Sequence, residues 1–351
     1  MNVEVVPAAS LTAEQLARWS QIQSGHSTYA SPFFSPQFTR IVAKTRDDVY
    51  VGLVEQGREA VAFFPFQIGR FRAGRPVGWS ICDYQGVVAE PGVEWNAKDL
   101  IGASGLRAWE FDHVVAAQRE FERFAHTRAT SPVIEISSDL ETLLQERHAT
   151  GVREIRAALR KMRKLEREHG DLRFVPHETA PEALATLLRW KQQQYLQTGV
   201  VDVLARPWVR QTLELAHATH DEGFAGLLSL LYAGDTLVAA HLGLRSRRVW
   251  HYWFPAYDPR FARYSPGIAL LLKMVEHASA LGIGSIDLGK GDARYKSSLA
   301  NTTVPLVEGR VELPSIAAAA GRLRRGVKTL GRRTTLARPV RRAIRRAARR
   351  R

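Results

Sequence analysis

Residues 234–258 read GDTLVAAHLGLRSRRVWHYWFPAYD, and they lie within a series of apolar runs. The runs Gly226–Tyr232, Thr236–Arg245 and Arg248–Tyr257 are rich in branched and aromatic side chains, which favour β-strands. The dipeptides Gly234-Asp235 and Ser246-Arg247 between them are typical of tight turns. The stretch therefore predicts three consecutive strands joined by short turns.

Helical patterns flank these strands. In Gly151–His169, the apolar residues Ile155, Leu159, Met162 and Leu165 recur at three- and four-residue spacing. Three further helices are predicted at Pro181–Gln197, Arg206–His220 and Pro266–Leu281, and short strands at Leu172–Val175 and Ser285–Leu288. The resulting order is helix, strand, helix, helix, three strands, helix, strand.

The first 148 residues also mix helices and strands. A helix is predicted over residues 11–23 with Thr12 as its N-cap. The strands Val49–Glu55 and Glu59–Gln67 are joined by a Gln56-Gly57 turn, and the segment 83–86 is a turn before Val87–Ala89. Because 351 residues exceed the usual size of one core, we expect two packed domains.

Three segments resemble the GNAT acyltransferases. They are Gly234–Leu244, Tyr257-Asp258 with Tyr264–Gly267, and Asp287–Lys296. The chain is similar to the CelD/BcsL-type enzymes of cellulose and exopolysaccharide biosynthesis, and more distantly to the Fem-type aminoacyl transferases. The resemblance implies an α+β GNAT fold, with a degenerate GNAT-like domain over 1–148, a catalytic GNAT domain over 149–312 and a basic tail over 313–351.

The donor is expected at the start of the helix that follows the third strand. The resemblance implies that Ser265, Pro266, Gly267, Ile268 and Ala269 bind the pyrophosphate of acetyl-CoA or another acyl-CoA. A helix N-terminus presents free N–H groups and a positive dipole end to an anion. The family's loop reads Gln/Arg-x-x-Gly-x-Gly/Ala, whereas this chain clearly keeps only the middle glycine, so an acyl carrier or aminoacyl-tRNA donor stays open.

Four residues are predicted to carry the chemistry. Asp287 could orient the acceptor or accept its proton, or it could cap the Gly289–Gly291 turn. Lys296 could stabilise an oxyanion, and Tyr295 could protonate the leaving thiolate, although both residue types also occur as ordinary surface or packing residues. His241 is a candidate base and His251 a weaker one, but histidines in apolar strands are often structural.

The positive charge is concentrated at one end of the sequence. Of the net charge of +15, 14 positive charges lie between Arg322 and Arg351, and no acidic residue follows Glu312. Residues 315–351 could bind an anionic membrane surface or form a solvated tail, whereas nucleic acid is a weaker expectation except for tRNA. The lack of a signal-peptide pattern predicts a cytoplasmic protein, and the single cysteine, Cys82, fits that compartment and predicts no metal site built on thiolates. No other metal site is predicted. If the basic tail binds lipid, the protein is peripheral at the inner face of the plasma membrane.

The sequence thus predicts an enzyme that transfers an acyl group to a hydroxyl or amine of a saccharide or nucleotide-sugar acceptor. Two alternatives remain open. One is a Fem-like transferase that uses aminoacyl-tRNA, and the other is a non-catalytic GNAT-like scaffold beside a polysaccharide synthase. Dependence of turnover on acetyl-CoA, or on tRNA, distinguishes the first two, and the scaffold requires neither.

Overall fold

A computed structural model of the chain describes residues 2–57, 59–136, 153–291 and 293–314. The strands are β1 Asn2–Pro7, β2 Val49–Gln56, β3 Glu59–Ile68, β4 Ala73–Arg75, β5 Val88–Ala89, β6 Ala108–Val115, β7 Ala125–Glu135, β8 Leu172–Val175, β9 His220–Asp221, β10 Phe224–Ala233, β11 Thr236–Arg245, β12 Val249–Tyr257, β13 Ser285–Asp287 and β14 Thr302–Glu312. The α-helices are α1 Ala13–Gly25, α2 Pro36–Ala43, α3 Ala97–Ala103, α5 Arg153–His169, α6 Pro181–Thr198, α7 Pro207–His217, α8 Pro266–Ala278 and α9 Arg294–Leu299.

One mixed sheet runs through the described residues. Its strand order is β1-β2-β3-β4-β6-β14-β7-β13-β12-β11-β10-β8, with β5 and β9 attached at its sides. Strands β10, β11 and β12 form the antiparallel series that residues 226–257 predict, and β13 pairs with β12 in parallel. The chain therefore has the mixed α+β, GNAT-like fold that the sequence predicts.

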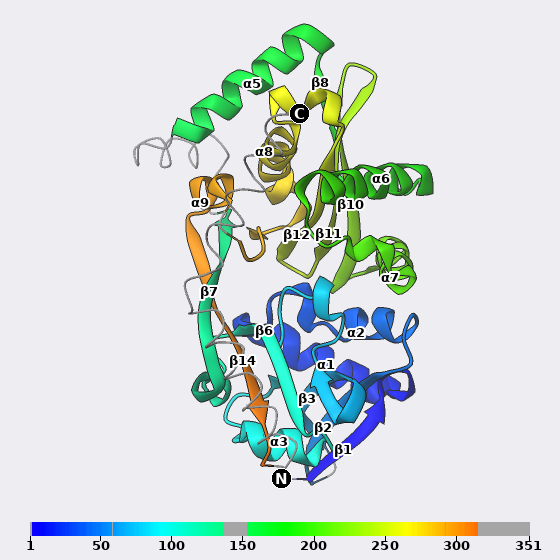
Figure 1. Ribbon diagram of the computed structural model, residues 1–351, viewed down its shortest axis with the longest axis vertical. Coiled ribbons are helices and arrows are strands. Elements are labelled where there is room, and N and C mark those ends of the chain that lie inside the picture. The colour runs from blue at the N-terminus through cyan, green and yellow to red at the C-terminus, as the bar shows by residue number, and fades with distance from the viewer. Residues whose placement is uncertain (1, 58, 137–152, 292, 315–351) are drawn as a thin grey trace, which may run out of the picture. The chain divides into compact units, whose positions relative to one another are not determined.

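Helices cover both faces of β10–β12. Helices α6 and α7 lie on one face, and α5 and α8 lie on the other (Figure 1). On β11, for example, Leu242 belongs to the core beneath α6 and α7, whereas Val238 belongs to the core beneath α5 and α8. Burial on two faces explains why these strands appear in the sequence as continuous apolar runs rather than alternating ones.

The strands β7 and β14 connect the two parts of the sequence. Strand β7 pairs with β13 and also with β14, and Figure 1 shows β7 and β14 side by side. Residues 2–311 belong to one compact unit, and the second unit begins at Glu312. The predicted boundary at 148/149 lies outside the described residues and stays a prediction, as does the predicted tail beyond 314.

Most predicted elements are present within one or two residues of their expected ends. Thr12 accepts a hydrogen bond from Gln15 N at 3.2 Å as the N-cap of α1, and Gly199 ends α6 in the left-handed conformation. The helix predicted over 206–220 ends at His217 instead, because His220 pairs with Ala225 in β9. No strand was predicted at β6, β7 or β14, and prolines at 132 and 305 weaken the strand signal in β7 and β14.

None of the helices described is long and apolar enough to span a bilayer. Across the described residues, no group of three or more His, Cys, Asp and Glu side chains is arranged to hold a metal ion.

Candidate active site

The parallel pairing of β12 and β13 is short. It runs from Val249 opposite Ser285 to His251 opposite Asp287. Beyond this point β12 continues to Tyr257 with β11 as its neighbour, while the chain after Asp287 enters the glycine-containing loop that leads to α9. The two strands therefore separate at His251 and Asp287, and the candidate site lies where they part.

The predicted donor loop consists of Ser265, which follows the 3-10 helix Pro259–Tyr264, and the first turn of α8. Ser265 has φ +55°, a left-handed conformation that is uncommon for residues other than glycine, and its Oγ accepts a hydrogen bond from Lys161 Nζ at 3.0 Å. Ile268 N and Ala269 N donate to Ser265 O at 3.0 and 3.3 Å, and Pro266 has no N–H. An anion at this helix start would thus be held mainly by Gly267 N–H and the Lys161 ammonium.

Space is open above Gly267. A Cβ added there would meet Tyr257 Cδ1 at 3.7 Å, an ordinary contact, so the protein's own packing does not require glycine at this position. The carbonyl of Gly267 accepts a hydrogen bond from the Tyr252 hydroxyl at 3.2 Å. This bond ties the start of α8 to β12 just beyond the point where β12 and β13 separate.

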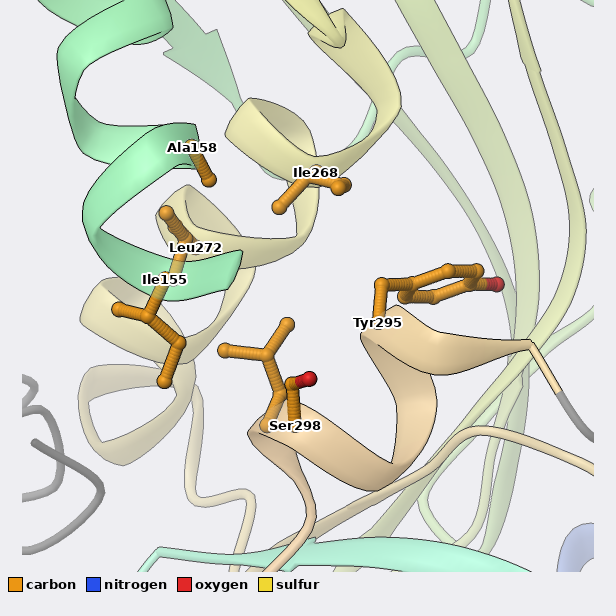
Figure 2. Close-up of a pocket in the computed structure, with 7 residues that line it drawn as sticks. Ile155, Ala158, Ile268, Leu272, Tyr295 and Ser298 are labelled. Carbon is orange, nitrogen blue, oxygen red and sulfur yellow. The ribbon is translucent and has the colours of Figure 1, made fainter. Parts of the chain in front are cut away.

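A small apolar pocket of about 10 Å³ lies beside the donor loop. Figure 2 shows its lining, which comes from α5, α8 and α9: Ile155, Ala158, Ile268, Leu272, Tyr295, Ser298 and Leu299. Burial raises the pKa of Tyr295 to about 12, so its phenol keeps its proton at neutral pH. The pocket therefore brings Ile268 of the predicted donor loop and the predicted acid Tyr295 together around one small cavity.

A second cluster lies at the strand separation itself. His251 Nε2 lies 2.8 Å from Asp83 Oδ2, and its Nδ1 lies 3.6 Å from Asp287 Oδ1. The His251 and Asp287 side chains are 0% and 4% exposed, whereas that of Asp83 is 28% exposed. Asp83 is therefore the member of this charged trio that a substrate can reach.

Electrostatics keep Asp83 ionised. Burial favours the neutral acid, but the hydrogen bond and charge of His251, together with the charge of Lys296, lower the pKa of Asp83 to about 2. A carboxylate with so low a pKa is a weak base at neutral pH. Its chemistry suits binding a donor group or a positive charge better than removing a proton.

Asp287 is a buried acceptor. Its Oδ1 accepts hydrogen bonds from Ser131 Oγ at 2.6 Å and from Gly289 N at 2.8 Å, and its Oδ2 accepts one from the Tyr84 hydroxyl. The bond from Gly289 is the turn cap that the sequence offered as one alternative. Tyr84 and Ser131 lie 203 and 156 positions before Asp287, so this carboxylate also joins distant parts of the chain.

Lys296 lies beside the same trio. Its Nζ donates to Gly289 O at 3.0 Å and to Lys290 O at 3.2 Å. Burial lowers the pKa of Lys296, and the charges of Asp83 and Asp287 oppose that shift. Of the four predicted catalytic residues, the structure thus brings Asp287 and Lys296 into one cluster, with Tyr295 adjacent to Lys296 in α9.

His241 is placed differently. It is fully buried in β11, its ring stacks on Tyr252 at 4.5 Å, and its Nε2 accepts a hydrogen bond from Trp253 N at 3.2 Å. Burial and the charge of His251 lower the pKa of His241 well below its usual value. Since the lone pair of Nε2 is already used, this geometry favours the structural alternative over the general base.

Helix α6 adds two groups that the sequence did not single out. Lys191 Nζ donates to Pro255 O at 3.0 Å, and burial, then the charge of Lys296, lowers the pKa of Lys191 to about 8. One turn later, Tyr195 has its pKa raised to about 12 by burial and, to smaller degrees, by Asp202 and Asp83. Lys191 therefore titrates in the pH range where a general base is effective.

Sequence reasoning missed Asp83, Tyr84, Ser131 and Lys191. Asp83 and Tyr84 belong to a segment predicted as a turn, and Lys191 lies within an amphipathic helix, so no local pattern marks them. What marks them is a contact with a distant part of the chain, 64 positions away for Lys191 and Pro255 and 156 positions away for Ser131 and Asp287. A contact of this kind is encoded in a family of sequences as covariation between the two positions, not as a local pattern in one sequence.

Comparisons with known proteins agree with the fold. The family model described as an acetyltransferase (GNAT) domain matches residues 153–297. No curated protein matches the chain in sequence.

Several solved structures are similar over most of their length. FemX has a TM-score of 0.54 and 9% identity, covering 91% of this chain and 99% of FemX. The C-terminal domain (DUF2156) of a protein assigned as a lysylphosphatidylglycerol synthetase from Agrobacterium fabrum has a TM-score of 0.52 and 12% identity, covering 89% of this chain and 95% of that domain. A tandem GNAT protein from the clavulanic acid biosynthesis pathway has a TM-score of 0.51 and 9% identity, covering 90% and 100%.

At identities of 9–12% the similarity to these structures shows a shared fold and nothing more. The family model matches the part of the chain from the start of α5 into α9. That part holds the donor loop, the apolar pocket, Asp287 and Lys296. Residues 153–297 of the chain therefore match a GNAT acetyltransferase domain, within a fold that a tandem GNAT protein shares.

Proposed function

We propose that this protein is an acyltransferase that moves an acetyl or other acyl group from acyl-CoA to a hydroxyl or amine of a saccharide or its precursor. The separation of β12 and β13 at His251 and Asp287 is the observation that carries the proposal. Within the described residues, it leaves the edge of β12 unpaired beyond His251. The start of α8 lies near one end of this edge, and the polar cluster of Asp83 and Lys296 lies at the point of separation.

The donor would approach from the helix start. The pyrophosphate would lie at Gly267 N–H and Lys161, where the positive end of α8 also favours an anion. The apolar part of the donor would lie against the apolar side chains between α5, α8 and α9, whose small pocket would have to widen to receive it. The thioester would then lie near Tyr295, whose phenol is protonated at neutral pH and can donate its proton to the leaving thiolate.

The acceptor would approach from Asp83. This carboxylate would orient the acceptor's hydroxyl or amine, and neutral Lys191 would take its proton during attack on the thioester carbonyl. The C–O or C–N bond forms first, Lys296 stabilises the oxyanion that results, and the C–S bond then breaks to release the thiolate that Tyr295 protonates. No covalent enzyme intermediate is required, since the fold holds the two reactants together.

Calorimetry with acetyl-CoA tests the donor placement. Gly267→Asp adds a carboxylate in open space, so the fold tolerates it while the pyrophosphate is repelled. We expect acetyl-CoA binding by the wild type and at least a ~100-fold loss of affinity in the variant, in keeping with a charge placed against a phosphate. Gly223→Asp, also in open space but far from α8 in sequence, is the control. Unchanged affinity in Gly267→Asp would refute the placement.

One observation favours a second candidate, a donor with a longer polyanionic part such as aminoacyl-tRNA. Helix α5 packs on α8 and exposes a basic surface, formed by Arg156, Arg160, Lys161, Arg163, Lys164 and Arg167. Such a surface binds phosphates without reading sequence. Retention of tRNA together with turnover that requires charged tRNA rather than acetyl-CoA would favour this candidate.

We propose in addition that residues 315–351, which lie outside the described part of the chain, bind anionic lipid at the inner face of the plasma membrane. The support is compositional, since 14 positive charges and no negative ones follow Glu312. Membrane contact of this kind would place the enzyme beside a polysaccharide synthase.

A further inference from the structure

A groove of about 250 Å³ opens beside helix α6. Its lining comes from α6, the end of β12 and the 3-10 helix before α8: Trp190, Gln194, Gln197, Tyr257, Pro259 and Ala262. Two of these side chains are aromatic, two are primary amides and two are small and apolar. The groove is therefore uncharged, unlike the neighbouring cluster of carboxylates and lysines.

The spacing along α6 connects the groove to the reacting groups. Trp190, Gln194 and Gln197 recur at intervals of four and three, so they form one stripe of the helix. Lys191 and Tyr195 form the adjacent stripe, and Lys191 Nζ donates to Pro255 O of β12 at 3.0 Å. A ligand in the groove thus lies one helical stripe away from the candidate base Lys191.

Gln194 provides an independent sign of a ligand. Its Oε1 is buried and has no hydrogen-bond partner among the described residues, although the side chain lines the groove. A buried acceptor without a donor has lost its hydration without a replacement, so such atoms are uncommon without a reason. A hydroxyl group of a bound molecule would supply the missing donor.

The chemistry of the lining selects the class of molecule. Aromatic side chains offer apolar surface to the C–H face of a ring, and amides exchange hydrogen bonds with hydroxyl groups without requiring a charge. An anionic ligand would meet no cation among the six lining side chains, and an alkyl chain would bury the amides without partners. A neutral ring that carries hydroxyl groups satisfies both kinds of side chain.

We infer that the groove between α6 and residues 257–262 is a saccharide subsite in which Gln194 and Gln197 bind the hydroxyl groups of a neutral sugar ring packed against Trp190 and Tyr257. The inference rests on the proposed function, since it gives the acceptor's saccharide a place beside Lys191. Tyr257 also borders the donor loop, 3.7 Å from a Cβ built at Gly267, so a sugar in the groove lies within reach of the donor.

Calorimetric titration of the full chain with cellotetraose, maltotetraose and chitotetraose tests the subsite. At least one should bind, and Gln194→Leu should weaken that binding tenfold or more. Gln193→Leu is a matched control, because Gln193 is an exposed glutamine on the same helix, outside the groove. If Gln194→Leu does not fold, as judged by its melting temperature, Gln194→Glu serves in its place.

Three results would overturn the inference: no binding of any of the three sugars, equal effects of Gln194→Leu and Gln193→Leu, or a loss of acetyl-CoA affinity instead of sugar affinity in Gln194→Leu. The last result would assign the groove to the donor's adenine. Titration with acetyl-CoA separates this inference from the proposed function. Sugar binding that depends on Gln194 in a chain that does not bind acetyl-CoA would preserve the subsite and refute the acyl-CoA proposal.

Discussion

Asp83 and His251 lie 168 positions apart in the sequence, yet Nε2 of His251 lies 2.8 Å from Oδ2 of Asp83. His251 is in β12, and Asp83 is in the segment between β4 and β5. The Phe33 ring packs at the same point, nearly perpendicular to the His251 ring, with the two ring centroids 4.9 Å apart. The pair thus joins a partly exposed carboxylate to the strand from which the donor site opens.

Asp83→Asn should reduce kcat/KM by about 100-fold, the scale of one positioned polar group, because the amide cannot hold the acceptor with a full negative charge. The variant should also lose stability that depends on pH. The folded-state pKa of about 2 lies below the ordinary value of 3.8, so the stabilisation is fully present above pH 3.8 and is lost as the pH falls through about 2.

Urea unfolding at pH 6 and pH 3 checks this second effect. The difference between wild type and Asp83→Asn should be larger at pH 6 than at pH 3. Asp47→Asn, an exposed aspartate in the same part of the chain, is the control for a simple loss of charge. A difference that does not change with pH would contradict the ion pair.

Lys296→Met and Asp287→Asn should both lose turnover but differ in stability. Loss of an oxyanion donor typically costs about 100- to 1,000-fold in kcat. Lys296 is half-buried and donates only to two loop carbonyls, so the melting temperature of Lys296→Met should differ little from that of the wild type. Asp287 accepts three hydrogen bonds in a buried position, and an unpaired partner there costs about 1–3 kcal/mol.

Scanning calorimetry measures the melting temperature of each variant, and thiol-release kinetics measure its turnover. The expected outcome is a clear drop in melting temperature for Asp287→Asn alone. Equal drops for both variants would show that Lys296 supports the Gly289–Lys290 loop rather than the reaction. If both variants turn over normally, the reaction takes place elsewhere.

Lys191 should determine the pH dependence of the rate. Its pKa of about 8 means that the fraction in the neutral, proton-accepting form increases as the pH rises through 8. The rate should therefore increase between pH 7 and pH 9 in the wild type, and Lys191→Met should abolish this increase and reduce kcat. Lys44→Met, which removes an exposed lysine, should keep the wild-type profile. A rise that persists in Lys191→Met would exclude Lys191 as the base.

Deletion of residues 315–351 should leave a cooperatively melting enzyme, because residues 2–311 belong to one compact unit. The full chain should sediment with vesicles of anionic lipid at low salt, and the deleted chain should not. Salt weakens the attraction between exposed charges and a surface, so 0.5 M NaCl should also release the full chain. Retention of duplex or tRNA instead of vesicles would assign the charge to nucleic acid and favour the aminoacyl-tRNA candidate.

Local patterns in the sequence determined the central elements of the fold. Strands β10–β12 are long apolar runs with turns between them, and Pro266 marks the start of α8, so their limits were predicted within about two residues. Asp287 and Lys296 were predicted because the segment Asp287–Lys296 resembles the C-terminal signature of the GNAT family, which is also a local pattern.

Only the tertiary structure decided which residues from distant parts of the chain lie opposite Asp287 and Lys296. Strands β7 and β14 contain Pro132 and Pro305, and their strand conformation depends on partners far along the chain rather than on their own propensities. Asp83 occupies a turn whose sequence resembles many other turns, and Gln194 is one of three consecutive glutamines that differ only in what surrounds them. Side-chain chemistry is encoded locally, but proximity across a sheet depends on pairing between distant strands, and for that reason the acceptor side of this site became visible only in the folded chain.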